Sequence, residues 1–256
     1  MASGTATRRK RAAQRVPAPP VAATPRAVGR RWLLAGLATA IVIAVGLGFV
    51  LARGDGNTVP DGATLPDAAE AAAIFHGVPQ QGVALGSSDA PVTIVEFVDL
   101  QCPFCRQFEV ETMPTLVEKY IRTSKARLEI RGLSFLGPDS ERGLRAVLAA
   151  SRQDRMFELA QLLYFNQGAE NSGWLNDDIV AAAARSTPGL DAARLGGDMD
   201  SDAVSALLEE HAAEAERLGI KSTPTVLVGP TGGSLKQVVL GSPRDIGAIE
   251  QAIAAA

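Results

Sequence analysis

The chain has 256 residues, of which 46% are hydrophobic, 21% charged and 5% aromatic, a composition that fits one ordinary domain with attached segments and excludes a disordered chain. Its two cysteines and two histidines are too few for a disulfide-stapled scaffold, and a zinc core would need all four, so we expect no metal centre. Eight of the 25 Lys and Arg residues lie in residues 1–31, which leaves 17 against 28 Asp and Glu in the remainder, and such an acidic body argues against nucleic acid as a partner.

The N-terminal segments predict a membrane anchor. Residues 1–31 are rich in Arg, Ala and Pro without an apolar period, which predicts a disordered, basic cytoplasmic tail. Residues 32–52 carry no charge, and as a helix rising 1.5 Å per residue they would span a hydrocarbon core of about 30 Å. Because the basic residues precede this segment, the rest of the chain is expected outside the membrane.

A cleaved signal peptide is the competing interpretation of the same segment, since Val50-Leu51-Ala52 is an acceptable cleavage site. We favour an uncleaved helix because the apolar run is longer than the core of such signals. Residues 53–84 are then predicted to form an extracytoplasmic linker, in which 67–76 form one short helix with few side chains to bury.

The folded domain is predicted over residues 85–256 and begins with a strand at 92–98. Its sequence, VTIVEFV, is β-branched and almost continuously apolar, as in a strand covered on both faces. A helix beginning at a proline follows over 103–122, with a kink at Met113-Pro114, and a second strand is expected at 126–131. A strand–helix–strand unit of this length makes its two strands parallel.

A helical insertion is predicted next, at about 139–218, because this stretch contains amphipathic patterns and no convincing strand. His211 lies on the apolar stripe of the last of these helices, which indicates a hydrogen-bonded residue of the core or of an interface. Strand signals return at 225–228 and 235–240 as a hairpin, and 245–255 form a closing helix. The pattern predicts an α/β fold.

The chemical centre of the sequence is Cys102-Pro103-Phe104-Cys105, between the end of the buried strand and the start of a helix. Cysteines three apart on one helical turn lie within the Cα distance that a disulfide needs. Cys102, at the positive end of the helix, is the predicted nucleophile, and Cys105 the resolving thiol.

Two other uses of the cysteine pair remain open. The pair could form an inert disulfide, although a bridge that closes so small a loop stabilises little. It could also supply two thiolates to a copper ion.

Three segments together resemble a known family. VTIVEFVDLQCPFCRQFE, the helical insertion and GIKSTPTVLVG are similar to DsbA-like thioredoxin-fold proteins, of the membrane-anchored kind found in Gram-positive, especially actinobacterial, envelopes. The resemblance covers about residues 78–256. It implies a thioredoxin fold, a central mixed sheet of four or five strands flanked by helices and interrupted by the helical insertion. It also implies thiol-disulfide exchange with secreted proteins.

The resemblance assigns roles to Pro224 and Thr223. From the residues alone, Pro224 would be an ordinary trans proline at a strand start. The family places a cis proline here, which implies that the backbone N–H and C=O of Thr223 are free to pair with an extended client segment.

Glu96 is unexpected within an apolar strand, because burying a carboxylate costs free energy unless the group is paired or protonated. From the pattern alone, an outward-facing or edge position is as good an explanation as a functional one. The family carries an acid here, which implies that Glu96 accepts the proton of Cys105 or modulates the thiolate.

Phe104 departs from the family pattern. Strongly oxidising members have a histidine between the cysteines, whose charge stabilises the thiolate, and Phe104 offers none. Phe104 and Pro103 instead present surface beside the sulfur to unfolded clients, or Phe104 simply packs at the rim.

We therefore predict a membrane-tethered oxidoreductase that forms disulfides in translocated proteins without an organic cofactor. Its expected partners are reduced secreted clients, a membrane partner that reoxidises it, and the lipid bilayer. A disulfide reductase or isomerase is the alternative with the same chemistry, and it would differ from this oxidase only in its redox poise. A tethered chaperone or metal-binding module is the alternative from another class.

Overall fold

The computed structural model of the protein describes residues 60 and 62–256. The predicted tail at 1–31 and the predicted membrane helix at 32–52 lie outside these residues. Among the helices that are described, none is both long and apolar enough to cross a membrane.

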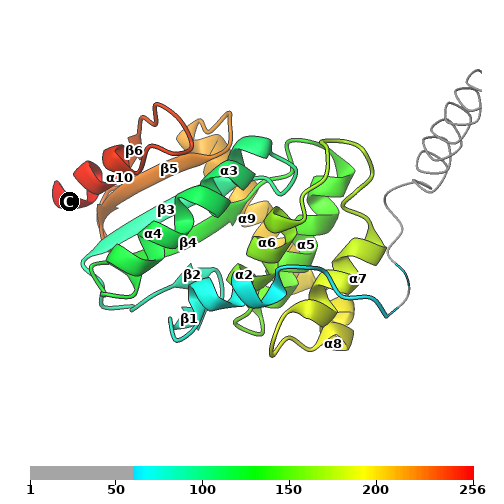
Figure 1. Cartoon of the computed structure of the whole chain (residues 1–256). Coiled ribbons are helices and arrows are strands. Elements are labelled where there is room, and N and C mark those ends of the chain that lie inside the picture. The colour runs from blue at the N-terminus through cyan, green and yellow to red at the C-terminus, as the bar shows by residue number, and fades with distance from the viewer. Residues whose placement is uncertain (1–59, 61) are drawn as a thin grey trace, which may run out of the picture. The chain divides into compact units, whose positions relative to one another are not determined.

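A six-stranded mixed sheet lies at the centre of the domain, in the order β1-β2-β4-β3-β5-β6 (Figure 1). Strand β3 pairs parallel with β4, and every other pair of neighbours is antiparallel. The resemblance implied four or five strands, whereas the sheet has six. Its strands are β1 (Gln80–Gln81), β2 (Ala84–Leu85), β3 (Val92–Val98), β4 (Ala126–Gly132), β5 (Thr225–Pro230) and β6 (Lys236–Val238).

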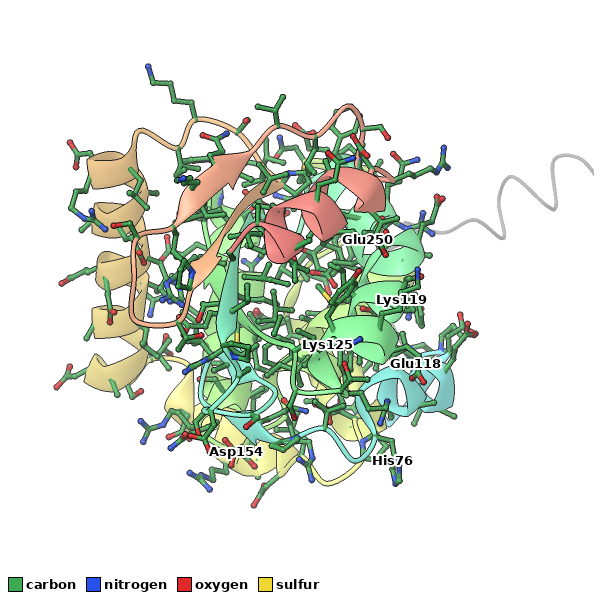
Figure 2. All side chains as sticks on the ribbon, turned by 90° about the vertical axis from the view of Figure 1, so that its left-hand side faces the viewer. His76, Glu118, Lys119, Lys125, Asp154 and Glu250 are labelled. Atoms are coloured by element: carbon green, nitrogen blue, oxygen red, sulfur yellow. The ribbon has the colours of Figure 1, made fainter. Side chains whose placement is uncertain are left out.

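Strand β3 has the predicted bounds, and all seven of its residues are buried. Helices cover both faces of the sheet around it: α3 (Pro103–Glu111) and α4 (Met113–Leu116) lie on one face and α9 (Asp202–Leu218) on the other (Figures 1 and 2). Because side chains alternate along a strand, Ile94, Glu96 and Val98 point to the α3 face. This layering explains the continuous apolar sequence of β3.

The helix predicted over 103–122 is interrupted where expected. Helix α3 ends at Glu111, α4 begins at Met113, and η1, a π-helical turn, covers Val117–Ile121. Pro114 has no backbone N–H to donate. It lies in the first turn of α4, where a backbone N–H would have no partner within the helix. The segment then leads to β4, and the β3–β4 pair is parallel, as predicted.

Five helices lie between β4 and β5, and no strand interrupts them, as predicted for the insertion. Helix α6 is the most deeply buried of them and packs against α2, α3 and α5. The first four of these helices are α5 (Pro138–Ser151), α6 (Met156–Phe165), α7 (Asp177–Ser186) and α8 (Ala192–Asp198), and α9 completes the set.

The prediction of a linker over residues 53–84 is wrong from Leu65 onward. Helix α2 (Ala68–Phe75) buries Phe75, whose ring lies 5.8 Å from that of Phe157 on α6. Strand β2 pairs with β4 and extends the sheet. The small residues of α2 allow a close approach to α6, and the Phe75 side chain then reaches the core. The helix therefore has a partner that its own sequence does not reveal.

The C-terminal part follows the predicted order of hairpin and helix. Strands β5 and β6 are antiparallel, and α10 (Ile246–Ala254) packs against both. An ion pair of 3.1 Å between Lys119 Nζ on η1 and Glu250 Oε1 joins α10 to the helices of the same face (Figure 2). His211 is buried on α9, and its Nδ1 accepts a hydrogen bond of 3.1 Å from the Gly132 N–H, which confirms its place in the core.

Candidate redox site

Cys102 is the N-cap residue of α3, directly after the loop that leaves β3. Its Sγ lies 3.5 Å from the backbone nitrogen of Cys105, which donates to it. The unpaired N–H groups and positive dipole end of a helix favour a thiolate at this position. The two thiols are free, not bridged, in this structure.

Hydrogen bonding lowers the pKa of the Cys102 thiol to about 6, chiefly through the Cys105 thiol. The Thr223 side chain and the backbone N–H groups of Cys105 and Phe104 act in the same direction, while burial opposes them. At neutral pH the thiolate of Cys102 therefore predominates.

Cys105 has the opposite character. It is fully buried, and burial raises its pKa well above the ordinary value, aided by its hydrogen bond to Cys102 and by the Cys102 charge. One thiol of the pair is thus ionised and the other protonated, which is the division of roles that a nucleophile and a resolving thiol require.

The Thr223–Pro224 peptide bond is cis, as the resemblance implied. The bond leads into β5 and brings Thr223 beside the cysteines, so that the Cys102 thiol donates to the Thr223 carbonyl oxygen at 3.3 Å. In this structure the carbonyl is therefore not free, contrary to the expectation.

Glu96 is completely buried in the central strand, so an outward or edge position is wrong. Neither carboxyl oxygen has a hydrogen-bond partner. Burial raises the pKa of Glu96 well above its ordinary value, and the charges of Glu109 and Cys102 raise it further.

Sequence reasoning missed Glu109, a second buried acid on α3 that is 2% exposed. Burial raises its pKa to about 8. The signal was present in the sequence, because Glu109 follows Cys105 by four positions and therefore shares its helical face. It was hidden by the neighbouring Glu111, which is exposed and bound to Arg244, since a pattern of acids on a helix usually marks a solvated surface.

The loop before Cys102 is held by contacts that the sequence did not predict. The carboxylate of Asp99 accepts hydrogen bonds from the Leu136 N–H at 3.0 Å and the Ser140 hydroxyl at 2.6 Å. The side chain of Gln101 donates to Ser140 Oγ at 3.0 Å, and that of Gln167 donates to the Cys102 carbonyl oxygen at 3.1 Å. The helical insertion thus positions the redox turn.

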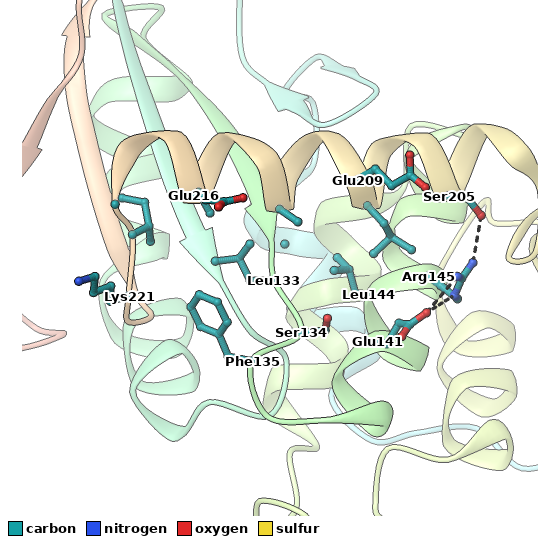
Figure 3. Close-up of a pocket in the computed structure, with 16 residues that line it drawn as sticks. Leu133, Ser134, Phe135, Glu141, Leu144, Arg145, Ser205, Glu209, Glu216 and Lys221 are labelled. Atoms are coloured by element: carbon teal, nitrogen blue, oxygen red, sulfur yellow. Dashed lines mark hydrogen bonds and ion pairs between the residues drawn. The ribbon is translucent and has the colours of Figure 1, made fainter.

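The surface around Cys102 is apolar and hollowed. Pro103 and Phe104 are exposed, Phe104 by 59%. A hollow of about 310 Å³ lies beside Cys102, and a groove of about 740 Å³ lies between α5 and α9 (Figure 3). Phe135 and Lys221 line both, so the two are neighbours. No group of three His, Cys, Asp or Glu residues in the described part of the chain is placed to hold a metal ion.

Comparison with known proteins gives relatives with the same fold. A family model described as thioredoxin matches residues 79–232, more than half of the chain. "Probable disulfide bond formation protein D" of Bacillus cereus is 29% identical over 164 residues, which cover 61% of this chain and 76% of that protein. "Disulfide bond formation protein D" of Bacillus subtilis is 25% identical over 150 residues, covering 56% of this chain and 66% of that protein.

Among solved structures, oxidised BdbD from Bacillus subtilis matches with a TM-score of 0.60 and 22% identity, covering 68% of this chain and 91% of that chain. DsbA2 from Pseudomonas aeruginosa matches with a TM-score of 0.54 and 26% identity, covering 69% and 94%. The chain belongs to the thioredoxin family and is a DsbA-like thiol-disulfide oxidoreductase.

Proposed function

We propose that this oxidoreductase forms disulfides in translocated proteins through Cys102 and Cys105. The observation that carries the proposal is the contrast between the two thiols. Cys102 caps a helix, and the pKa of its thiol is lowered to about 6. Cys105 is buried, and the pKa of its thiol is raised. A stabilised Cys102 thiolate favours the reduced protein, which makes its disulfide a ready oxidant. The names of the Bacillus relatives support the same direction.

In the proposed reaction, a client thiolate attacks Cys102 Sγ and the disulfide to Cys105 breaks. The electron pair of that bond goes to Cys105, which takes a proton, and Glu96 is the proposed source of that proton. A second client thiolate then attacks the mixed disulfide and releases Cys102 as a thiolate. Glu96 fits this role because it is a buried carboxyl with a raised pKa on the α3 face.

The client is proposed to bind beside the cis proline. Once Cys102 no longer donates to it, the Thr223 carbonyl oxygen can accept a hydrogen bond from an extended client segment, as in the addition of a strand to a sheet edge. Pro224 directs this backbone toward Cys102. The exposed Pro103 and Phe104 offer an apolar contact for unfolded chains.

We also propose that residues 32–52 anchor the protein in the membrane, with residues 1–31 in the cytoplasm and the catalytic domain outside. The support is the uncharged run of 21 residues and the basic residues before it. A membrane partner would then reoxidise the reduced pair. Protease added to intact spheroplasts should remove the domain and leave a membrane-bound N-terminal fragment.

The C105S variant tests the exchange chemistry. It lacks the resolving thiol, so mixed disulfides with client proteins should accumulate through Cys102, and they should disappear in the C102S/C105S variant. A chaperone that merely binds clients would retain them without covalent adducts. If C105S formed no mixed disulfides in the presence of reduced clients, the proposed exchange chemistry would be wrong.

The reduction potential of the pair tests the direction. A value near that of strong periplasmic oxidants, roughly −120 mV, agrees with disulfide formation, whereas one near roughly −270 mV, typical of thioredoxin, would assign a reductase. Equilibration of the full chain with glutathione buffers measures it.

A further inference from the structure

The groove between α5 and α9 has the length of a short peptide segment. One face of α9 forms a wall of it, on which Ser205, Glu209, Ala212 and Glu216 lie three or four positions apart (Figure 3). Because an α-helix rises 1.5 Å per residue, the wall from Ser205 to Gly219 is about 21 Å long. An extended chain that rises about 3.3 Å per residue places about six residues along this wall.

The bottom of the groove is apolar. The buried residues that line it are Gly132, Leu133, Leu144, Ala215 and Ile220. On the α9 wall, Ala212 is exposed, and its methyl group leaves space that a larger side chain would fill. An apolar side chain that enters the groove therefore exchanges water for apolar surface, which favours association.

The groove lies beside the hollow at Cys102, since Phe135 and Lys221 line both. Phe104 lines the hollow as well, and Phe104 and Phe135 are the exposed phenylalanines among the described residues. Exposed apolar surface of this kind marks an interaction site. A segment that lies in the groove has its next residues beside Cys102.

The charged residues of the groove give it an acidic wall. Arg145 forms an ion pair of 2.9 Å with Glu141, so these two charges offset each other (Figure 3). Glu209 and Glu216 are exposed, and neither forms an ion pair with a described residue. The other cation of this lining, Lys221, lies at the end shared with the hollow. The α9 wall is therefore complementary to a basic ligand.

We propose that this groove binds an extended client segment that carries apolar and basic residues within about six positions of the reactive cysteine. The proposal rests on the function proposed above and names the kind of client that reacts fastest. The apolar side chains pack on Leu133 and Leu144, and the basic ones face Glu209 and Glu216. The groove holds the client thiol near Cys102 and takes no part in the exchange, so its residues set specificity.

The test uses the oxidised full chain and reduced peptides that share one pair of cysteines and differ only in an arm of about six residues. One arm contains leucine and lysine, another leucine and glutamate, and another serine and lysine. Each arm precedes the cysteines in one set of peptides and follows them in a second set. Each second-order rate constant is divided by that of dithiothreitol with the same variant. Because dithiothreitol has no arm, the ratio reports how the arm binds.

For the wild type, the leucine–lysine arm should raise this ratio about tenfold over the serine–lysine arm in at least one set, since leucine leaves water in the groove. It should exceed the leucine–glutamate arm about threefold at low salt, and about 1 M salt should remove this difference by screening the exposed charges. A wild type that distinguishes no arm in either set would overturn the proposal.

Two pairs of variants locate the preference in the groove. A212W fills the groove and should abolish the preference for leucine, whereas A213W, at an exposed alanine of α9 outside the groove, should retain it. E216K should remove most of the preference for lysine, and E210K, at an exposed acid of α9 outside the groove, should keep it. An A212W protein with an undiminished leucine preference, or equal losses in E216K and E210K, would overturn the assignment.

Other outcomes separate this inference from the proposed function. A wild type that oxidises none of the peptides would overturn the proposed function itself, whereas equal oxidation of all arms overturns only the inference. Sedimentation of the wild type and of A212W tests whether a second copy of the chain fills the groove instead. The two proteins should sediment alike, and a dimer that A212W dissociates would overturn the assignment of the groove to clients.

Discussion

The side-chain amide of Gln167 donates to the carbonyl oxygen of Cys102 at 3.1 Å, across 65 positions of sequence. The same Nε2 donates to the Leu100 carbonyl at 2.8 Å. Gln167 stands just after α6, so the helical insertion directly holds the turn between β3 and α3. The insertion is therefore part of the redox site and not only a neighbour of the sheet.

Replacement of Gln167 by Leu should loosen this turn. The Leu100 and Cys102 carbonyl oxygens would each lose one donor, although the Cys102 oxygen still accepts from the Arg106 N–H. This loss should lower the free energy of unfolding by about 1–3 kcal/mol and slow peptide oxidation. Q153L is the matched control, because Gln153 donates to the Asp191 carbonyl at 3.2 Å at an exposed site. Urea unfolding and the oxidation rate measure both effects. Equal losses of rate in the two variants would contradict a positioning role for Gln167.

The pKa of Cys102 predicts how the reduced protein reacts with iodoacetamide. Because hydrogen bonds, first of all that of the Cys105 thiol, lower this pKa to about 6, the alkylation rate should rise through pH 6 and level off near pH 7. Cys105 should stay unmodified over this range, since burial raises its pKa. Peptide mapping by mass spectrometry identifies the modified residue. A midpoint near 8.5, the ordinary value for a free cysteine, would show that the helix N-terminus does not stabilise this thiolate.

Phe104 is expected to limit the oxidising strength of the pair. An imidazolium at its position would add a positive charge beside the Cys102 thiolate, so F104H should lower the pKa of Cys102 and raise the reduction potential. Each unit of that pKa corresponds to about 30 mV. F104A removes the exposed ring without adding charge and should leave the potential close to that of the wild type. If F104A and F104H shifted the potential equally, the ring and not the missing charge would set it.

Much of the fold follows from local patterns in the sequence. The apolar run at Val92–Val98, the proline at the start of α3 and the amphipathic helices of the insertion all have the predicted structure, because each feature constrains its own segment. The burial of helix α2 was not predicted, because no feature of its own segment determines it. It depends on a partner, α6, which lies about ninety residues further along the chain.

The residues of the candidate site also differ in how far the sequence alone predicts them. The cysteine pair is visible because spacing alone brings Cys102 and Cys105 together on one helical turn. Glu96 stood out as a charge within an apolar strand, but its depth could not be judged without knowing which helices cover β3. Gln167 carries no local signal, because an amide that holds a distant backbone resembles any surface glutamine until the chain is folded.

His211 should make the folded protein sensitive to mild acid. Burial, aided by the charge of Arg131, lowers its pKa to about 4, whereas an unfolded histidine titrates near 6.5. Between these values the unfolded chain binds a proton that the folded chain does not. The stability that neutral His211 contributes is therefore fully present above about pH 6.5 and falls as the pH decreases toward 4, by about 2–3 kcal/mol in all.

The H211Q variant isolates this contribution, because glutamine does not titrate and its oxygen can still accept from the Gly132 N–H. Urea unfolding at pH 7 and pH 4 should show a smaller acid-induced loss for H211Q than for the wild type. H76Q is the control, since His76 is exposed at the end of α2, and its loss should equal that of the wild type. If H211Q lost as much stability as the wild type between the two pH values, acid sensitivity would have to come from the carboxylates alone.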